Sequence, residues 1–550
     1  MFKNFLLVII VVLFIRCDSK KSYSKINLPQ KINLFQKQSP LSEEEEKNWY
    51  LKDIITDSLP GISLTQIYDS LLINKKGKEV IIAVLDSEID IEHKDIKKHI
   101  WKNEDEIPNN GIDDDKNGYI DDINGWNFLG NNKGENILNA NYEYVRIVRK
   151  YQNLFKNKKE IQIKKEDLPD FRKYIGAKTK LDSEFSKMKR RLKYGEIIFQ
   201  NFLNAKEALK NYFPEEIYTY EKLKEIDTLG NDLGKHVIEI KLLLDYNDTE
   251  ANMKRVRDDT KNDINYRLNL DYNPRLILAD NPDNINDKNY GNNKLSENLD
   301  KYTHGTRMAS VVLDKLENET NEIIVMPIII ESLGDAYDKD IALGIKYAVD
   351  NGAKVINMSF GKEFSMYPEW VHEAFKYAEK HNVLIVSSCG NDGKKLDNDF
   401  QKYPNDNIFK GKKEVSDNFL FVGASTINLN KELKASYSNY SNKYVDIFAP
   451  GDKIYTTFPN GGKKIDRGTS ISTALTSRVA ALLFSYYPNL TASQVKHILM
   501  DSGLEYDIEV STPTKDDKNK MTPFNQLSKS GKVLNAYNAF IMADSISRSN

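Results

Sequence analysis

The chain has little cysteine, almost no net charge and, at its N-terminus, a hydrophobic run too short to cross a membrane. Among its 550 residues are two cysteines, and the formal net charge is −2. A composition this close to neutral gives no argument for nucleic-acid binding. Two cysteines allow at most one intrachain disulfide, and none can form if one of them is modified. The apolar run from Phe5 to Ile15 has 11 residues, whereas a membrane-spanning helix needs about 20.

The N-terminal segment has the features of an export signal. Lys3 precedes the apolar run, and Arg16-Cys17-Asp18 follows it directly. A positive charge before a short apolar stretch is typical of a signal peptide, so residues 1–17 are predicted to direct export. Cys17 resembles the lipidated cysteine of bacterial lipoproteins, although Phe14-Ile15-Arg16 lacks the small residues expected before it. A lipid anchor at the cell envelope and a secreted protein both stay open, and a membrane contact is expected only through that anchor.

Residues 18–75 are polar and are predicted to be a tether that leads into a partly helical segment. From residue 76 to 545, short apolar runs alternate with amphipathic helical patterns. The runs span 80–85, 323–330, 355–358, 383–386 and 419–423, and the helical patterns span 340–350, 368–380, 472–487 and 492–501. Continuous apolar strands separated by helices indicate a mainly parallel sheet covered on both faces. The predicted fold class is therefore α/β, a three-layer sandwich.

Residues 131–300 interrupt this alternation with a predicted helical insertion. One apolar seam recurs at steps of three and four residues, with one gap that holds Gly195, at Leu181, Phe185, Met188, Leu192, Phe199 and Phe202. A second helix is predicted from Tyr144 to Phe155, so the insertion is expected to be a hairpin of helices. Residues 141–200 hold 17 Lys and Arg against 8 Asp and Glu. Two interpretations stay open for this charge: a cap that screens substrates or docks to an anionic surface, and, more simply, a solvated polar face.

Three short motifs carry the candidate chemistry, and their order along the chain is informative. They are Val84-Leu85-Asp86-Ser87, Thr303-His304-Gly305-Thr306 and Gly468-Thr469-Ser470. A serine hydroxyl needs an imidazole to take its proton and a carboxylate to hold that imidazole in the right tautomer. The order Asp, His, Ser differs from that of chymotrypsin-like enzymes and of α/β-hydrolases. The residue two after Ser470 is Ser472 instead of glycine, so the G-x-S-x-G elbow of the α/β-hydrolases is absent. Each motif alone is common, since Gly-Thr-Ser is also an ordinary helix N-cap.

Taken together, the order and the local contexts of these motifs resemble the subtilisin-like serine peptidases. The resemblance covers roughly residues 78–130 and 300–540. It implies that Asp86, His304 and Ser470 form the catalytic triad. The joint occurrence of three motifs in the family's order is much harder to reach by chance than any single motif.

Two further segments support the same resemblance. Ser387 to Gly393 is similar to the family's Ala-Ala-Gly-Asn segment, which implies that Asn391 helps form the oxyanion hole together with the backbone N–H of Ser470. Asn391-Asp392-Gly393 alone would be an ordinary turn. Ser359, Phe360 and Gly361 lie in a segment that resembles the family's substrate-binding strand, which pairs with an extended peptide.

Four residues depart from the family pattern: Glu88, Arg307, Ser472 and Ala474. None of them replaces a triad residue, but Glu88 and Arg307 can bring charge near His304 and shift its pH profile. We therefore keep two hypotheses. The first is an exported, monomeric serine endopeptidase that acts on protein or peptide substrates. The second is a catalytically impaired surface protein of the same fold that binds peptide or envelope partners.

An acidic loop is predicted to bind calcium in a structural role. Asp113, Asp115, Asn117, the carbonyl of Tyr119 and Asp121 alternate along the chain, and Gly118 supplies the turn at the sixth position. Oxygen ligands from one tight loop suit Ca²⁺. Position twelve is Asn124 instead of glutamate, so a helix-loop-helix EF-hand is not supported. The alternative is an acidic surface loop without a metal.

Overall fold

A nine-stranded sheet forms the centre of the molecule. The computed structural model describes residues 37, 39–314, 323–407 and 413–549. The strand order is β10-β13-β7-β6-β5-β4-β1-β3-β2. All neighbours in this sheet pair in parallel except β10 and β13. The main strands are β1 Val80–Asp86, β3 Ile323–Ile329, β4 Val355–Met358, β5 Leu384–Ser388, β6 Phe419–Ser425 and β7 Ile447–Pro450. The short strands of this sheet are β2 Trp126–Asn127, β10 Leu504–Glu505 and β13 Lys532–Val533. Two separate two-stranded sheets pair β8 Ile454–Thr457 with β9 Lys463–Asp466, and β11 Glu509–Ser511 with β12 Met521–Pro523.

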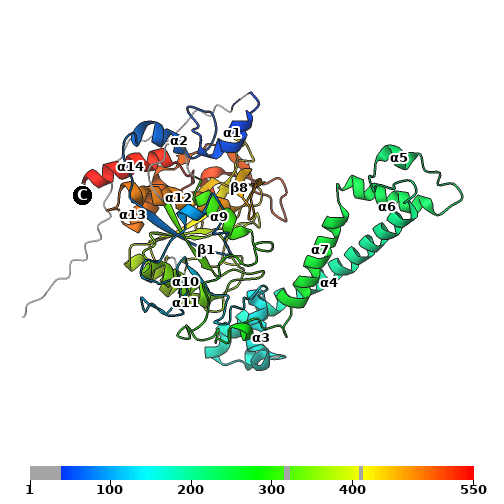
Figure 1. Ribbon diagram of the computed structural model, residues 1–550, viewed down its shortest axis with the longest axis horizontal. Coiled ribbons are helices and arrows are strands. Elements are labelled where there is room, and N and C mark those ends of the chain that lie inside the picture. Colours follow the sequence, from blue (N-terminus) through cyan, green and yellow to red (C-terminus); the bar gives the residue numbers. More distant parts are fainter. Residues whose placement is uncertain (1–36, 38, 315–322, 408–412, 550) are drawn as a thin grey trace, which may run out of the picture.

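Helices cover both faces of the sheet (Figure 1). On one side lie α9 His304–Val312, α12 Thr469–Tyr486, α13 Ala492–Ser502 and α14 Ala536–Ser549, and on the other lie α10 Asp338–Asp350 and α11 Pro368–Lys380. Alternate side chains of β1 enter the two cores, because successive residues of a strand point to opposite faces. Ile82 and Val84 pack with α12, whereas Ala83 and Leu85 pack with α10 and α11. The predicted three-layer α/β fold is confirmed.

The N-terminal segment, predicted to be a tether that leads into a partly helical segment, is exposed or intermediate up to residue 48 and packs on the core from Trp49 onward. It contains α1 Glu43–Asn48 and α2 Leu64–Gln66. Trp49, Ile62 and Ile67 belong to the same apolar core as α12 and α14. The N–H of Ala536 donates to the carbonyl of Ile62 at 2.7 Å. This segment therefore covers part of the sheet's α12 face. Residues 1–36, which include Cys17, lie outside the described residues. Among the residues that the structure describes, no helix is long and apolar enough to span a membrane.

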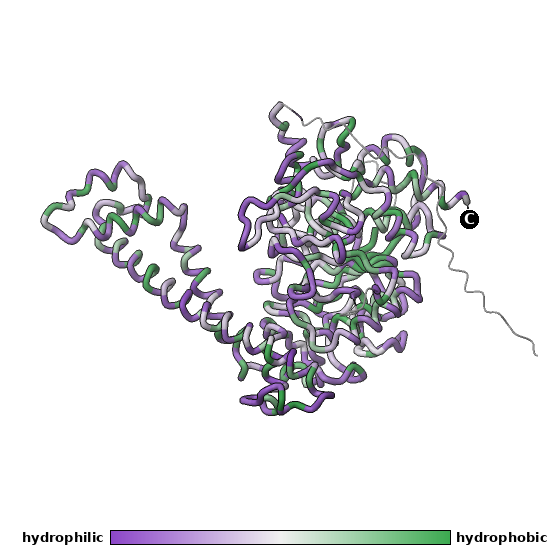
Figure 2. Tube along the Cα trace, turned by 180° about the vertical axis from the view of Figure 1, so that it is seen from behind, coloured by the Kyte–Doolittle hydropathy of each residue, from purple (hydrophilic) through white to green (hydrophobic). Residues whose placement is uncertain are grey.

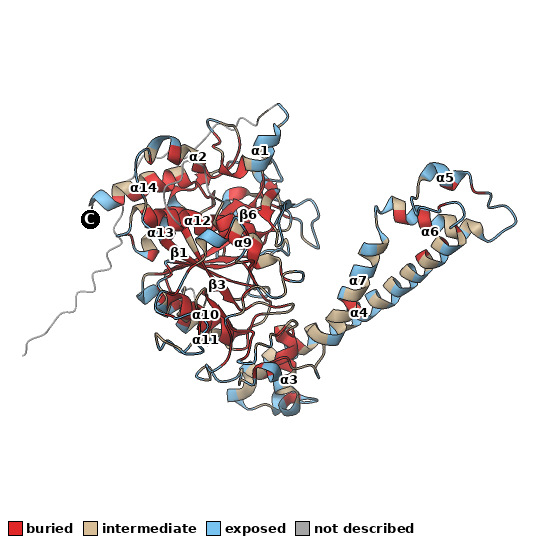
Figure 3. Ribbon diagram, in the orientation of Figure 1, coloured by how far each residue is buried: buried red, intermediate tan, exposed pale blue. Residues whose placement is uncertain are grey.

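Between β2 and α9 the chain forms an arm of helices that projects from the sandwich (Figure 1). The helices are α3 Glu143–Phe155, α4 Leu168–Ala208, α5 Tyr220–Lys224, α6 Leu233–Asp245, α7 Glu250–Asn262 and α8 Arg275–Leu278. Helix α4 continues through Gly195 without a break. Figure 2 shows that the arm is mainly hydrophilic with scattered hydrophobic positions, whereas the strands of the sandwich are hydrophobic. Figure 3 shows the same division in burial: the strands of the sandwich are buried, whereas most of the arm is exposed or intermediate.

The arm has two small apolar clusters instead of one continuous core. The cluster at its base contains Tyr144, Val148, Phe171, Leu181 and Met188 together with Met366 of the sandwich. The cluster at its tip contains Phe202, Leu209, Phe213, Leu223 and Ile240. The base is thus packed on the sandwich, while the tip is stabilised by contacts within the arm.

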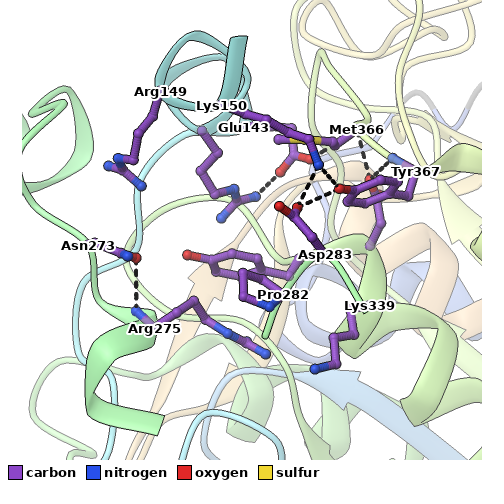
Figure 4. Close-up of a pocket in the computed structure, with 13 residues that line it drawn as sticks. Glu143, Arg149, Lys150, Asn273, Arg275, Pro282, Asp283, Lys339, Met366 and Tyr367 are labelled. Carbon is purple, nitrogen blue, oxygen red and sulfur yellow. Dashed lines mark hydrogen bonds and ion pairs between the residues drawn. The ribbon is translucent and has the colours of Figure 1, made fainter. Parts of the chain in front are cut away.

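Ion pairs also join the base of the arm to the sandwich (Figure 4). Arg146 pairs with Glu143 on the same helix, and both side chains are buried. Lys150 lies 3.0 Å from Asp283 and over the ring of Tyr367, 4.8 Å from its centroid. These groups line a cavity of about 330 Å³. Glu143 also lies 3.4 Å from Nζ of Lys362 in the sandwich, and both side chains are buried. Because removal of one partner leaves the other buried charge uncompensated, this pair holds α3 in position on the sandwich.

Candidate active site

Asp86 is the last residue of β1 and lies at the carboxyl edge of the parallel sheet. Its side chain is 0% exposed, and its two carboxylate oxygens lie 2.8 and 2.9 Å from Nδ1 of His304. The N–H of Ser87 donates to the same carboxylate at 2.7 Å. A carboxylate held in this way keeps the proton of the imidazole on Nδ1 and leaves Nε2 free to accept another.

His304 begins α9, and the glycine after it allows α9 to approach β1 closely. A Cβ at Gly305 would lie 2.2 Å from the carbonyl oxygen of Ser87. The N–H of Gly305 donates to the hydroxyl of Ser87 at 3.1 Å, and the hydroxyl of Thr306 accepts from the N–H of Asp90 at 2.9 Å. Because residue 305 has no side chain, α9 can approach β1 closely, and this approach places the imidazole of His304 beside Asp86.

The pKa of His304 is set by opposing effects. Burial lowers it, but the charge and hydrogen bond of Asp86 and the charge of Glu331 outweigh burial, so the pKa is raised above its ordinary value of 6.5. The positive charge of Arg307 lowers the pKa of His304. A general base works in its neutral form, so base catalysis by His304 is available above this raised pKa and is lost as the pH falls through it.

Ser470 lies in the first turn of α12 and faces the loop after β4. Its hydroxyl donates to the carbonyl of Ser359 at 2.8 Å, and the hydroxyl of Ser359 donates to the carbonyl of Ser470 at 3.0 Å. The first N–H groups of a helix have no intrahelical partner and carry a partial positive charge. The N–H of Ser470 is therefore suited to stabilise an anion formed next to its own side chain.

Glycines permit the turn that precedes Ser470. A Cβ at Gly451 would lie 2.3 Å from Oγ of Ser472, and the N–H of Gly468 donates to the carbonyl of Gly451 at 2.8 Å. The hydroxyl of Ser472 donates to the carbonyl of Ala449 at 3.0 Å. Ser472, one of the departures from the family pattern, thus faces the backbone of β7 and not the site.

Asn391 lies in the turn after β5 and contacts the same glycine turn. Its Oδ1 accepts from the N–H of Thr469 at 2.9 Å and from the hydroxyl of Thr469 at 3.0 Å. Its Nδ2 lies 3.6 Å from the position that a Cβ on Gly468 would occupy. The carboxamide is therefore held through its oxygen, and its nitrogen lies beside the turn that carries Ser470.

The predicted substrate-binding segment follows β4 and borders two cavities. Ser359 and Phe360 are buried, and Gly361 is exposed. A cavity of about 250 Å³ lies on the side of His304. A cavity of about 450 Å³ lies on the side of Gly361 and Asp392. The second cavity is also lined by residues of the arm, namely Tyr144, Lys180, Glu184, Lys187 and Met188. The base of the arm thus borders the groove where a peptide would lie.

The two charged departures from the family pattern have partners of their own. Glu88 accepts from the backbone N–H and the side-chain amide of Asn298, at 2.5 and 2.8 Å. Arg307 forms an ion pair with Asp466 at 2.7 Å. Both have a partner within the protein, although Nε of Arg307 is buried without a hydrogen bond to any described residue. Ala474 is buried in the core of α12. These residues therefore leave the geometry of Asp86 and His304 intact.

Glu331, two residues beyond β3, was not predicted as a site residue. Its carboxylate, a carboxylate oxygen of Asp86 and a ring nitrogen of His304 all lie within 4.8 Å of one another. One signal in the sequence could have indicated it. Glu331 directly follows the apolar run 323–330, and in the structure that run pairs with the strand carrying Asp86.

The acidic loop gathers a different set of oxygen atoms from the predicted one. Asp113 and Asp115 lie together with Glu106, with one oxygen of each within 4.8 Å of the others. The carboxylate of Asp121 accepts from two backbone N–H groups, those of residues 110 and 111, at 3.1 and 3.0 Å. The amide nitrogen of Asn117 donates to Asp115 and Asp122, and its Oδ1 accepts from the N–H of Tyr119 at 2.8 Å. The ring of Tyr119 packs on Trp126 and Tyr347, and the role of its backbone carbonyl stays a prediction.

Cys389 is buried directly after β5. Burial raises its pKa to about 12, and its thiol donates to the carbonyl of Asn439 at 3.3 Å. A thiol with a raised pKa is a poor nucleophile near neutral pH. The structure thus agrees with the expectation that this cysteine packs as a small hydrophobic residue.

Among the described contacts, Asp86 pairs with His304, while the hydroxyl of Ser470 bonds to Ser359 and not to His304. An aspartate and a histidine paired at the carboxyl edge of a parallel α/β sheet, with a serine held on the loop of the neighbouring strand β4, fit the class of hydrolases that use serine as a nucleophile. The profile of the Peptidase_S8 family, described as the subtilase family, matches residues 77–528. The chain therefore belongs to the subtilase family of serine peptidases.

Individual relatives resemble only part of the chain. The cell wall-associated protease of Bacillus subtilis (strain 168) is 33% identical over 218 residues, which is 38% of this chain and 22% of the relative. Subtilisin DY of Bacillus licheniformis is 31% identical over 215 residues, 38% of this chain and 73% of the relative. Among solved structures, the prenylagaramide maturation protease PagA is 27% identical and covers 44% of this chain and 83% of its own, with a TM-score of 0.35.

Proposed function

We propose that the chain is an exported serine endopeptidase that hydrolyses peptide bonds in protein or peptide substrates. The observation that carries the proposal is the pairing of both Asp86 oxygens with Nδ1 of His304, in a chain that also retains Ser470 and Asn391. Hydrolysis of a quenched-fluorescence peptide library by the purified mature protein, and its loss in Ser470→Ala, tests the proposal.

In the proposed reaction, the extended substrate pairs with the backbone at Ser359 to Gly361. Rotation of the Ser470 hydroxyl away from the carbonyl of Ser359 turns it toward Nε2 of His304, which takes the proton as Oγ attacks the scissile carbonyl. Asp86 stabilises the imidazolium that forms. Asn391 Nδ2 and the N–H of Ser470 donate to the oxyanion. The protonated imidazole then gives its proton to the leaving amine, and water hydrolyses the acyl-enzyme with His304 again as base.

The alternative function is a surface protein of the same fold that binds peptides without cleaving them. The described residues favour the enzyme for a specific reason. The charged departures Glu88 and Arg307 are paired elsewhere, and Asp86, His304, Asn391 and Ser470 are all present. A protein released from selection for catalysis has no need to keep all four groups.

We further propose that Ca²⁺ binds the acidic loop and stabilises the fold. Glu106, Asp113 and Asp115 place carboxylate oxygens together, and among the described residues none of the three forms an ion pair with a lysine or arginine. Oxygen ligands without a cationic partner fit a hard divalent ion, whose remaining ligands would be backbone carbonyls and water. The bound ion would offset the repulsion among these carboxylates.

Chelation is expected to lower the melting temperature and leave turnover of a small substrate nearly unchanged. Binding to the folded state alone adds about 2.7 kcal/mol to the free energy of unfolding when calcium is a hundredfold above its Kd. Differential scanning calorimetry in EDTA and in millimolar calcium measures the shift. Asp115→Asn should melt like the chelated protein and ignore added calcium. Glu104→Gln, an exposed acid in the same segment that pairs with Lys102, is the control and should keep the response. Identical melting in both buffers would contradict the calcium proposal.

Export is proposed from the N-terminal sequence alone. If residues 1–17 direct lipoprotein export, cleavage before Cys17 leaves that residue at the mature N-terminus with a diacylglyceryl group on its sulfur. Mass spectrometry of the N-terminal peptide, from protein isolated from membranes of the native host, should find this modification. An unacylated N-terminus beyond residue 17 would instead indicate a secreted protein without an anchor.

A further inference from the structure

A carboxylate stands beside the catalytic pair without a cation to balance it. Glu331 lies within 4.8 Å of both Asp86 and His304, and it is partly exposed. It lines the cavity of about 250 Å³ that also touches His304 and Ser359. The carboxylate is therefore accessible from the side on which a bound peptide would lie.

The surroundings of Glu331 are negative. Among the described residues its carboxylate forms no ion pair with a lysine, arginine or histidine, and the nearby His304 is paired with Asp86. Burial and the charges of Asp86 and Asp335 raise the pKa of Glu331 to about 8, and His304 opposes them. Lys301 lines the same cavity but is exposed. A positive charge brought into the cavity would therefore meet a carboxylate that has no cationic partner of its own.

A second polar group in this cavity also lacks a partner. Ser332 is 8% exposed, and its hydroxyl forms no hydrogen bond with any residue that the structure describes. Buried hydroxyls are normally paired, so an orphan beside a carboxylate indicates a ligand that donates hydrogen bonds. Tyr302, which is buried, and Leu333 line the cavity as well and offer apolar surface.

We propose that Glu331 is a specificity-determining residue that makes the protein prefer substrates with a lysine or arginine side chain in this cavity. The inference rests on the proposed peptidase function and names the substrate class of that same site. An ammonium or guanidinium group supplies both the missing positive charge and a donor for Ser332. The methylene stem of either side chain can pack on Tyr302 and Leu333 while its charged end reaches Glu331.

The preference should increase with pH. In the free protein Glu331 carries a proton near neutral pH, and it becomes an anion as the pH rises through about 8. The groups that face it are Asp86, Asp335 and His304, with Lys301 in the same cavity. Cleavage of every substrate needs neutral His304, so the titration of His304 cancels when two substrates are compared at each pH. The ratio of their kcat/KM values then reports on Glu331.

The test is a positional scan with the purified mature protein. Peptide amides carry Lys, Gln or Glu in turn at each position before the scissile bond, and kcat/KM is measured for each from pH 6 to 9. At one position Lys should exceed Gln by about 10–100-fold, the range expected for a hydrogen bond to a charged group. The ratio should grow as the pH rises. Glu331→Gln should bring it close to one and remove its pH dependence, and Glu331→Lys should reverse it in favour of Glu.

Glu373→Gln is the matched control, because Glu373 is exposed on α11, lines neither cavity beside the site and is already paired with Lys376 at 2.8 Å. It should leave the Lys-to-Gln ratio unchanged. Fluorophosphonate labelling of each variant shows whether its catalytic serine is intact. Normal labelling of Glu331→Gln with an unchanged ratio would overturn the role of Glu331 alone. If the wild type neither reacts with the probe nor cleaves any peptide, the peptidase function fails and this specificity fails with it.

Discussion

Ser470→Ala is expected to lower kcat for peptide hydrolysis by about 10⁶-fold, a figure taken from the equivalent change in subtilisin. Without Oγ no acyl-enzyme can form, so hydrolysis must proceed by direct attack of water within the site. The hydroxyl donates to Ser359 in the free protein, and its loss removes one hydrogen bond at the start of α12. The melting temperature should therefore change little. Steady-state kinetics on a fluorogenic peptide amide measures the loss, and calorimetry verifies the fold.

Ser472→Ala is the matched control for that substitution. Ser472 lies one half-turn further along α12, and its hydroxyl donates to the backbone carbonyls of Ala449 and Pro450. It should alter stability by about 1 kcal/mol, the usual contribution of one hydrogen bond, and leave kcat within a few fold of wild type. Activity that survives in Ser470→Ala but not in Ser472→Ala would contradict the assignment of the nucleophile.

Asn391→Ala is expected to lower kcat by about 10²–10³-fold with little change in KM, as for the loss of one oxyanion donor in subtilisin. A donor that meets charge developing in the transition state contributes to turnover more than to substrate binding. Geometry supports this role, because Oδ1 of Asn391 is occupied by Thr469 while Nδ2 lies beside Gly468. Initial rates over a range of substrate concentrations separate kcat from KM.

Asn391→Asp distinguishes the donor role from a purely structural one. An aspartate keeps an acceptor for the N–H and hydroxyl of Thr469, so it preserves the turn, but it replaces the donating nitrogen with an anionic oxygen. If Asn391 serves the oxyanion, Asn391→Asp should lose at least as much kcat as Asn391→Ala. Near wild-type kcat in Asn391→Asp would show that the side chain matters only for the turn before Ser470.

The sheet could be predicted because its strands are continuous apolar runs. β3 was predicted at 323–330 and lies at Ile323–Ile329, and β4 lies at Val355–Met358 as predicted. Both strands are buried on two faces, and burial on both faces leaves an unbroken apolar sequence. The strands β2, β10 and β13 were not predicted. Each has two residues, which is too short for any periodicity to be recognised.

The described N-terminal segment shows where local composition misleads. The glutamates at 43–46 are exposed or partly exposed, as a tether requires, yet Trp49, Leu64 and Ile67, further along the same polar segment, belong to the apolar core of α12 and α14. Their apolar side chains are spaced irregularly, because the segment follows the surface of the core instead of forming one long helix. Only the tertiary contact determines which of these residues are inside.

The site was predictable as far as its residues are tied to local backbone shape. Gly305 permits the contact with Ser87 that brings His304 to Asp86, and glycines at 451 and 468 shape the turn before Ser470. These requirements leave short motifs in the sequence. Glu331 has no such motif: the apolar run before it indicates a strand end, but its nearness to Asp86 depends on the pairing of β3 with β1. Its role comes from a neighbouring strand and not from neighbours along the chain.

The central claim is that Ser470, activated by His304 and Asp86, is a catalytic nucleophile. The most direct measurement is to treat the purified mature protein with a fluorophosphonate probe at pH 8, digest it, and locate the phosphonylated residue by mass spectrometry. The labelling is repeated up to pH 9, because His304 acts as a base only above its raised pKa. We expect one adduct, on Ser470, which is absent from Ser470→Ala and strongly reduced in His304→Ala. Folded protein that forms no adduct, or forms it on another serine, would contradict the account.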